Sequence, residues 1–203
     1  MWNAKVLSKL KRKGRGKLIA YWLEWDHRLF LWINHFSGSG WDYFFAWPTH
    51  LATPLVYGIV LILMMIWDRE RILIKILAVA AAGLGSGSIN LLLKHLINRP
   101  RPYAFFIDDI TKGKAIVHTI FNTYFSTSFP SGHTVVAFAV VTALNVIYRK
   151  KLLGLYLLAA YLALTRVYVG AHFPSDVVAG ALTGTMVGYL IASLFKKYTG
   201  SSA

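Results

Sequence analysis

Long apolar stretches, separated by short polar segments, make up most of this 203-residue chain. A bilayer core of about 30 Å needs about 20 mostly apolar residues in a helix, because irregular backbone cannot face lipid. Five stretches reach or approach that length: roughly Leu51 to Trp67, Ile72 to Leu93, Thr134 to Tyr148, Leu152 to Val169 and Val177 to Phe195. The pattern predicts an all-α fold, a polytopic bundle of membrane helices.

A sixth stretch, Leu18 to Phe36, is long enough to cross a membrane but carries four ionisable residues at positions 24, 26, 27 and 28. It could equally lie in the interface plane. Cytoplasmic loops collect Lys and Arg, and the basic clusters at 69–75, 149–151 and 196–197 share one side if the five spans alternate. The basic N-terminus joins them only if the sixth stretch crosses. We therefore expect six transmembrane helices with both termini in the cytoplasm.

These stretches divide the chain into one membrane domain with short tails. We expect a basic cytoplasmic tail at residues 1–17, a six-helix domain at 18–197 and a short polar tail at 198–203. The longest connection, residues 94–130, is expected outside the cytoplasm. Glycines at helical spacing, Gly83/Gly87 and Gly180/Gly184/Gly188, are expected to let membrane helices approach closely.

Composition supports a membrane protein and excludes several other classes. Hydrophobic residues make up 56% of the chain and charged residues only 15%, which excludes a disordered protein. The net charge of +14 would normally suggest nucleic acid, but seven of the cations lie in the first seventeen residues and apolar runs fill most of the rest. We therefore expect a lipid bilayer as partner, and no nucleic acid. The chain has no cysteine, which excludes disulfides and thiolate chemistry.

Polar residues gather in three segments that the expected topology places at one membrane level, outside the cytoplasm. They are Lys94 to Pro102, Ser128 to His133 and Thr165 to Asp176. Each alone could simply meet lipid headgroups. However, the positive-inside bias should deplete this face of cations, and six are expected there: Lys94, Arg99, Arg101, Lys112, Lys114 and Arg166.

Two of these segments have the composition of helix N-termini. Pro130-Ser131-Gly132-His133 offers a capping serine and a glycine where the backbone must approach another group, and Pro174-Ser175-Asp176 places a carboxylate in a first turn. Helix N-termini present free N–H groups that bind anions, phosphate above all. The four-residue separation of His172 and Asp176 lets the carboxylate hold one imidazole nitrogen while the other faces the anion.

Together the three segments resemble the signature of the type 2 phosphatidic acid phosphatase family of integral membrane lipid phosphatases. The signature is Lys-x6-Arg-Pro, Pro-Ser-Gly-His and Ser-Arg-x5-His-x3-Asp. Here it is matched by Lys94 to Pro102, Pro130 to His133 and Thr165 to Asp176, with Thr165 in place of serine. The short chain is most similar to minimal bacterial phosphatidylglycerophosphatase B type enzymes.

The resemblance implies a phosphoryl transfer in two steps through a phosphohistidine. His172 would attack phosphorus with Asp176 orienting its ring, and His133 would protonate the departing alkoxide and then activate water. Lys94, Arg101, Arg166, Ser131 and the Gly132 backbone N–H would bind the phosphate oxygens. No metal or cofactor is implied. Asp108 and Asp109 are adjacent carboxylates without nearby histidines, a pattern more typical of a solvated loop.

The motifs recognise the phosphate group and leave the identity of the lipid that carries it undetermined. We expect a phosphatidylglycerol phosphate phosphatase in the cell membrane, with its active site on the extracytoplasmic face. An undecaprenyl diphosphate phosphatase or a broad-range lipid phosphatase is the alternative, in which Arg99 and Lys112 could serve a second phosphate. A transporter is a remote alternative, because spans two to six lack ionisable residues near their centres. The aromatic residues of segment 94–130 either cover the site or lie among headgroups.

Overall fold

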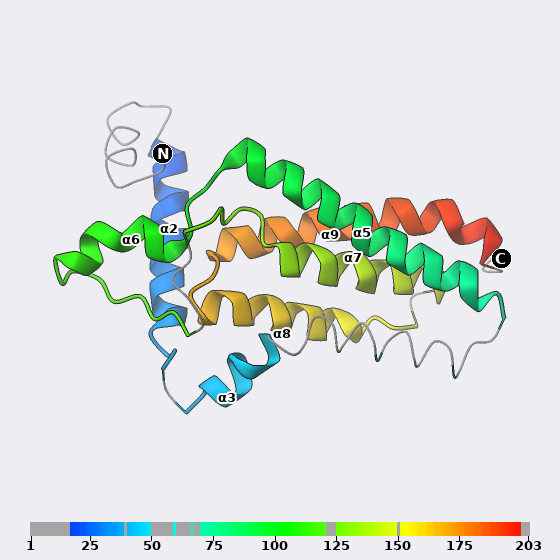
Figure 1. Ribbon diagram of the computed structural model, residues 1–203, viewed down its shortest axis with the longest axis horizontal. Helices are drawn as coiled ribbons and strands as arrows, with labels where there is room; N and C mark the ends of the chain where they lie inside the picture. Colours follow the sequence, from blue (N-terminus) through cyan, green and yellow to red (C-terminus); the bar gives the residue numbers. More distant parts are fainter. Residues whose placement is uncertain are drawn as a thin grey trace.

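Four helices lie side by side and form the body of the molecule in the computed structural model, which describes residues 17–38, 40–49, 59, 66, 70–120, 125–149 and 151–199 (Figure 1). They are α5 (Ile72–Ile97), α7 (Gly132–Ile147), α8 (Leu155–Tyr168) and α9 (Pro174–Phe195), which the short 3-10 helix η2 (Lys196–Tyr198) extends. Three further helices are α2 (Lys17–Asn34), α3 (Asp42–Phe45) and α6 (Pro102–Thr111). The described part of the chain contains one isolated β-bridge, between Pro100 and Thr127. The all-α prediction is confirmed.

The bundle has two chemically different ends. At one end, the guanidinium of Arg71, before α5, donates to the Tyr198 carbonyl oxygen at 3.2 Å, and Lys75 Nζ lies 5.7 Å from the centroid of the Tyr148 ring. The basic clusters that flank α5, α7 and α9 therefore meet at this end, as the charge pattern predicts. The three polar segments lie at the opposite end, because each joins the helix ends that point the other way.

Small residues allow α7 and α9 to pack in close contact. A Cβ atom added to Gly184 would lie 2.1 Å from the Val135 carbonyl oxygen, and one added to Gly188 would lie 2.3 Å from that of Ala139. The expected close packing is thus confirmed for the α9 glycines. For Gly87, no atom of the described residues lies within 4 Å of an added Cβ, whereas the neighbouring Gly85 faces Ile191 at 2.7 Å.

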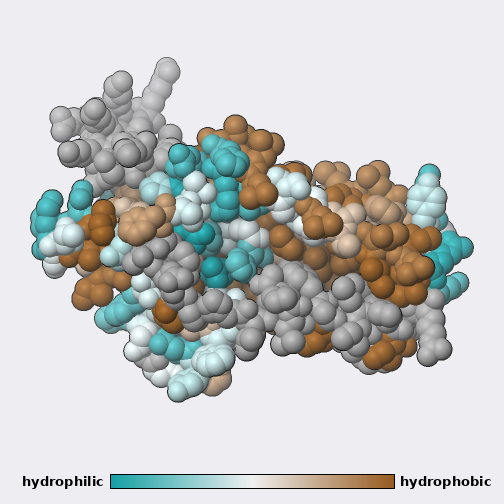
Figure 2. Space-filling view, viewed as in Figure 1, coloured by the Kyte–Doolittle hydropathy of each residue, from teal (hydrophilic) through white to brown (hydrophobic). Residues whose placement is uncertain are grey.

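The surface of the bundle is apolar between two more polar ends (Figure 2). Two of the described helical segments, Ile72–Ile97 and Pro174–Tyr198, are long and apolar enough to cross a bilayer, and two shorter apolar helices are Gly132–Ile147 and Leu155–Tyr168. The expected span from Leu51 to Trp67 lies outside the described residues, except for positions 59 and 66. Six crossings therefore remain an expectation from the sequence.

The segment expected as the first crossing is arranged differently from the bundle helices. Asp26 bonds to Ser175, Phe30 packs on the Phe173 ring at 5.3 Å between centroids, and the Asn34 amide donates to the Tyr168 carbonyl oxygen at 2.8 Å. These three positions of α2 all contact the same end of the bundle, so α2 lies across that end instead of alongside it (Figure 1). This arrangement is the one expected for the in-plane alternative.

The physical reason is the distribution of polar and aromatic side chains around α2. Its bundle-facing stripe contains the buried residues His27, Phe30 and Asn34, and the Asn34 amide donates to the carbonyl oxygens of Tyr168 and His118. Its opposite face exposes Trp22, Trp25 and Trp32, each more than half accessible, as is typical of helices at a membrane interface. Because α2 lies at the end opposite the basic clusters, an in-plane α2 would not provide the crossing on which the expectation of two cytoplasmic termini depends.

Candidate active site

A tight connection between α8 and α9 presents His172 at the polar end of the bundle. The Arg166 carbonyl oxygen accepts the backbone N–H groups of Ala171, at 3.0 Å, and His172, at 3.2 Å, so the chain folds back over the last turn of α8. Gly170 has a φ of +77°, and a Cβ there would lie 2.3 Å from the His118 carbonyl oxygen. Glycine is required at this point. The turn leaves His172 only 2% exposed.

Asp176 lies beside His172 in the first turn of α9, as the sequence predicts. Its Oδ2 is 3.7 Å from His172 Nδ1 and accepts the backbone N–H of the N-cap residue Phe173 at 2.8 Å. The Ser128 hydroxyl donates to the same oxygen and lies 3.4 Å from His172 Nδ1. Since Nδ1 faces this carboxylate and hydroxyl, Nε2 is the ring nitrogen left for a ligand.

The electrostatic surroundings keep His172 uncharged. Burial lowers the pKa of His172 to about 3; Asp176 opposes this shift, and the positive charges of Arg101 and Arg166 add to it. At neutral pH the imidazole is therefore neutral and retains a lone pair. The same charges show that Arg101 and Arg166 lie close to the histidine, as the sequence motifs predict.

The three predicted cations come from three different elements. Arg166 occupies the last turn of α8 and is 7% exposed, whereas Arg101 immediately precedes α6 and is half-buried. Lys94, in the last turn of α5, donates from Nζ to the Thr127 carbonyl oxygen at 2.8 Å. This bond ties α5 to the segment that precedes α7. The cations converge on one end of the bundle, where they can bind an anion.

The Pro-Ser-Gly-His segment forms the start of α7, as predicted. Ser131 is the N-cap residue, but its side chain makes no capping bond; its Oγ accepts the Thr134 hydroxyl at 3.0 Å and its N–H donates to the Asp176 carbonyl oxygen at 3.0 Å. The next N–H groups, from Gly132 onward, belong to the helix turn that has no intrahelical acceptors. His133 is exposed in that turn.

Gly132 has a specific neighbour that the motif alone does not reveal. A Cβ at this position would lie 3.0 Å from the side-chain nitrogen of Asn90, a residue of α5 that is 6% exposed. The backbone of the Pro-Ser-Gly-His segment thus approaches α5 closely enough that an added Cβ would require the Asn90 side chain to shift.

Sequence reasoning missed three residues of this site: Ser128, Arg99 and Asp26. Ser128 was noted only as the start of a segment, yet its hydroxyl lies between His172 and Asp176. Arg99 was considered for a second phosphate, but its guanidinium bonds to Asp176 and Asp26, so it binds carboxylates instead. Asp26 lies 73 residues before Arg99, in a helix rich in aromatic residues. Nothing in the local sequence of either residue predicts that the two side chains form a pair.

The departure from the family motif at Thr165 has a direct structural explanation. Its hydroxyl donates to the Leu162 carbonyl oxygen at 2.7 Å and accepts from the Thr49 hydroxyl at 2.6 Å. Thr165 is fully buried, so these bonds satisfy it within the protein. Its role here is to link α8 to the segment after α3.

The segment expected as a long loop contains a helix, α6. Phe106 is 7% exposed and stacks on Phe30 of α2, with ring centroids 6.1 Å apart, while Phe105 lies 4.3 Å from the His27 ring. These two aromatic residues therefore form the packing between α6 and α2. Phe125 differs, being 71% exposed and in contact with Tyr103 at 5.8 Å. Phe121 and Tyr124 lie outside the described residues.

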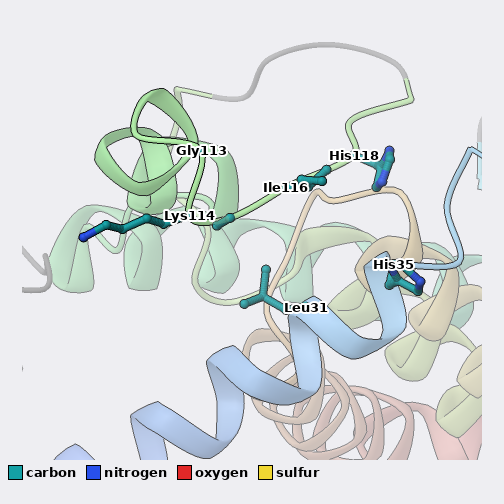
Figure 3. Close-up of a pocket in the computed structure, with 7 residues that line it drawn as sticks. Leu31, His35, Gly113, Lys114, Ile116 and His118 are labelled. Atoms are coloured by element: carbon teal, nitrogen blue, oxygen red, sulfur yellow. The ribbon is translucent and has the colours of Figure 1, made fainter.

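A pocket of about 370 Å³ lies beside the C-terminal part of α2 (Figure 3). It is lined by Leu31, His35, Gly113, Lys114, Ala115, Ile116 and His118, and includes none of the predicted site residues. Lys114 extends away from the two histidines in Figure 3. This pocket is separate from the His172 centre. Asp108 and Asp109 lie in α6, and the described part of the chain holds no cluster of three or more acidic or histidine side chains suited to a metal.

Comparisons with known proteins agree on one family. A lipid A 1-phosphatase of Rhizobium johnstonii is 35% identical over 117 residues, which cover 55% of this chain and 44% of the relative. A lipid A 4'-phosphatase of Bacteroides thetaiotaomicron is 28% identical and covers 90% of this chain and 82% of its own length. This chain thus spans less than half the length of the Rhizobium relative.

Solved structures and family models extend the likeness to the fold and the motifs. The crystal structure of Aquifex aeolicus LpxE is similar with a TM-score of 0.64 and 31% identity, covering 82% of this chain and 93% of that one. The model of the PAP2 superfamily matches residues 71–199, which include all three polar segments and the helices that carry them. The chain belongs to the PAP2 superfamily.

Proposed function

We propose that this protein is a membrane phosphatase that hydrolyses the phosphomonoester of a lipid through a phosphohistidine at His172. The observation that carries the proposal is the state of His172: buried, neutral, and held at Nδ1 beside Asp176 and Ser128, with Arg101 and Arg166 nearby. A neutral imidazole fixed at one nitrogen is a nucleophile at the other.

In the first step, Nε2 of His172 bonds to phosphorus while the bond from phosphorus to the lipid oxygen breaks. The imidazole gains positive charge as it attacks, and the Asp176 carboxylate, 3.7 Å away, stabilises that charge. His133, exposed in the first turn of α7, protonates the departing lipid oxygen. It then takes a proton from the water that releases phosphate and restores His172.

The transferred phosphoryl group carries its charge on three equatorial oxygens. Arg101, Arg166 and Lys94 supply the positive charge, and the first turn of α7 supplies N–H groups from Gly132 onward. Ser131 contributes by holding this turn against α9, since its N–H binds the Asp176 carbonyl oxygen. Cations and helix dipole together occupy the role that metal ions have in other phosphatases.

The mechanism is therefore proposed to be independent of metal ions and cofactors. Activity should survive excess EDTA, and millimolar vanadate should inhibit because it adopts the five-coordinate shape of the transferring phosphoryl group. Phosphate release from a lipid phosphate, measured with and without EDTA, tests this. Loss of activity with EDTA and recovery with Mg²⁺ would contradict it.

Phosphorylated lipid A is the substrate best supported by the relatives, since the Rhizobium and Bacteroides proteins are named lipid A phosphatases. Phosphatidylglycerol phosphate, expected from the chain's short length, and undecaprenyl diphosphate remain candidates. The assignment of Arg99 to carboxylates removes one argument for a second phosphate in the pocket.

A substrate panel with the purified protein decides among them. Released phosphate is measured in one detergent for lipid A, phosphatidylglycerol phosphate and undecaprenyl diphosphate, and kcat/KM values are compared. We expect the highest value for lipid A and no release by His172→Ala with any substrate. Mass spectrometry of the lipid A product shows which of its phosphates is removed. No release from any of the three by the wild-type protein would contradict the proposed function.

A further inference from the structure

The guanidinium of Arg99 bonds to three side chains in the described part of the chain. The side chain follows α5 and the residue is 8% exposed. It donates to Asp176 Oδ1 at 2.7 Å, to Asp26 Oδ2 at 2.6 Å and to the Ser175 hydroxyl at 2.7 Å, and it lies 4.1 Å from the centroid of the Phe173 ring. A buried charge is stable only with such partners.

Asp26 joins α2 to this cluster from the other side. Its Oδ1 accepts the Ser175 backbone N–H at 2.8 Å, and its Oδ2 accepts the Ser175 hydroxyl at 2.6 Å as well as Arg99. The carboxylate therefore caps the first turn of α9 from a different helix, the same turn that contains Asp176. It also balances the charge of Arg99.

These bonds fix the carboxylate that faces His172. Asp176 is completely buried, and its two oxygens are held by different groups: Oδ1 by Arg99, Oδ2 by Ser128 and the Phe173 N–H. Without Arg99, Oδ1 would lose its donor among the described residues, and only the two bonds to Oδ2 would orient the carboxylate. The orientation of His172 Nδ1 depends on that carboxylate.

We propose that Arg99 and Asp26 are positioning residues for the His172 centre: Asp26 holds Arg99, and Arg99 holds Asp176 in the orientation that directs His172 Nε2 to phosphorus. The inference rests on the proposed function and extends it. It makes α2 a component of the active site, in addition to its exposed tryptophan face. Asp26 lies outside the three motifs that suggested the family, and Arg99 occupies one of the variable positions of the first motif.

The chain supplies a matched control on the same helix. Glu24 accepts from Arg28 at 2.6 Å, the same distance as the Asp26–Arg99 pair, but the Arg28 and Glu24 side chains are 76% and 37% exposed. Exposed pairs contribute little. Asp26→Asn and Glu24→Gln make the same chemical change to a buried and an exposed carboxylate.

The experiment measures kcat and KM of the full-length protein in detergent with a lipid phosphate. Asp26→Asn and Arg99→Met should lower kcat about tenfold or more with KM within about threefold, because the phosphate-binding cations are untouched. Arg99→Lys should fall between Arg99→Met and the wild type, since one ammonium can meet one carboxylate but not two. Glu24→Gln should match the wild type.

A double variant tests whether Asp26 and Arg99 act together on the active site or each only stabilises the fold. The double variant Asp26→Asn with Arg99→Met should be little slower than Arg99→Met alone, because both changes release the same carboxylate. Equal effects of Asp26→Asn and Glu24→Gln, or losses that appear only in KM, would overturn the proposal. If Asp26→Asn fails to fold, Asp26→Glu and Arg99→Lys are used in its place, because they keep both charges. Their kcat and KM values are compared with those of the wild type and Glu24→Gln.

Vanadate and orthophosphate binding keep this test distinct from that of the proposed function. Orthophosphate is bound by charge alone, whereas vanadate gains from a correctly oriented imidazole as a mimic of the transition state. Arg99→Met should weaken vanadate binding about tenfold and leave orthophosphate binding unchanged, even if every lipid tested proves to be the wrong substrate. Equal losses for both anions would contradict the positioning role.

Discussion

Asp176 is the most constrained side chain of the candidate site. It is fully buried and receives bonds from the segment after α5, from the segment before α7 and from its own helix turn. His172 beside it is neutral because burial outweighs the nearby carboxylate. Each of these side chains is therefore held by a neighbouring one. Single substitutions should separate the roles of the individual residues.

The first prediction separates the two histidines by leaving group. His172→Ala should abolish turnover of every substrate, whereas His133→Ala should slow a lipid phosphate by about 10²–10⁴-fold because the alkoxide needs a proton to depart. With p-nitrophenyl phosphate, whose leaving group needs none, His133→Ala should still form phosphohistidine and accumulate it. The measurement is acid-labile, alkali-stable phosphoprotein.

The label should vanish when His172 is also replaced. If the phosphohistidine hydrolyses unaided, no label is trapped, but p-nitrophenyl phosphate should still restore turnover relative to the lipid. Neither a trapped label nor this restoration would mean that His133 is not the acid–base group.

The second prediction concerns acid stability. The pKa of His172 is lowered by burial to about 3 from an ordinary value of 6.5. Between these values the unfolded chain binds a proton that the native protein does not, so the free energy of unfolding falls as pH decreases from about 6.5 toward 3. His172→Gln removes this contribution, and its melting temperature should fall less than that of the wild type between about pH 7 and pH 4.5.

Thermal unfolding in detergent at both pH values is the measurement. His35→Gln, which replaces an exposed histidine immediately after α2, is the control and should keep the wild-type pH dependence. An unchanged pH dependence in His172→Gln would show that another group causes the acid sensitivity.

The contact between α7 and α9 is the tightest feature at the scale of elements. Gly180, Gly184 and Gly188 lie on one stripe of α9 and bring its backbone against Ser131, Val135 and Ala139 of α7 and its N-cap. Since α7 begins with the Pro-Ser-Gly-His segment and α9 begins with Asp176, this contact sets the distance between two halves of the site.

A pair of glycine substitutions tests this contact. Gly184→Ala places a Cβ 2.1 Å from the Val135 carbonyl oxygen, and the backbone must shift, which should cost about 1–3 kcal/mol and lower activity. Gly87→Ala meets no atom of the described residues within 4 Å and should be neutral or stabilising by up to about 1 kcal/mol, because alanine favours helix. Melting temperature and kcat of both variants are compared. Equal tolerance of both changes would refute the close packing.

The whole molecule is polarised along its bundle axis. Basic residues meet where α5 begins and α9 ends, and the His172 centre lies at the opposite end, with an apolar surface between (Figure 2). Positive residues near short loops favour the cytoplasm. We therefore propose that the site faces outward and that α2 rests on the outer interface through its exposed tryptophans.

Cysteine labelling tests this orientation, because the chain has no cysteine of its own. Lys112→Cys, after α6, should react with an impermeant maleimide in intact cells, while Lys151→Cys, between α7 and α8, should react only after lysis; both positions are exposed. The opposite pattern would reverse the topology. Reaction of both residues after lysis is the control that each thiol is accessible.

The amino-acid sequence by itself determined the class of fold and most of the candidate site. Apolar runs of span length allow only helices in lipid, and the spacing of the three motifs placed His172, Asp176, Arg101 and Arg166 at one end of the bundle. Short-range geometry was equally readable: Asp176 closes the first turn of α9 as its position after proline predicts.

Only the tertiary structure decided the orientation of α2 and the partners of Arg99. A stretch that contains Trp, Asp and His is long enough either to cross or to lie flat, and the choice depends on contacts with Ser175, Phe173 and Tyr168, which are more than 130 residues away. Likewise, a cation in a phosphate-binding segment is expected to bind phosphate until the fold places two carboxylates against it. Local patterns determine helices and their caps because those interactions span a few residues; which buried charges meet depends on packing between distant segments.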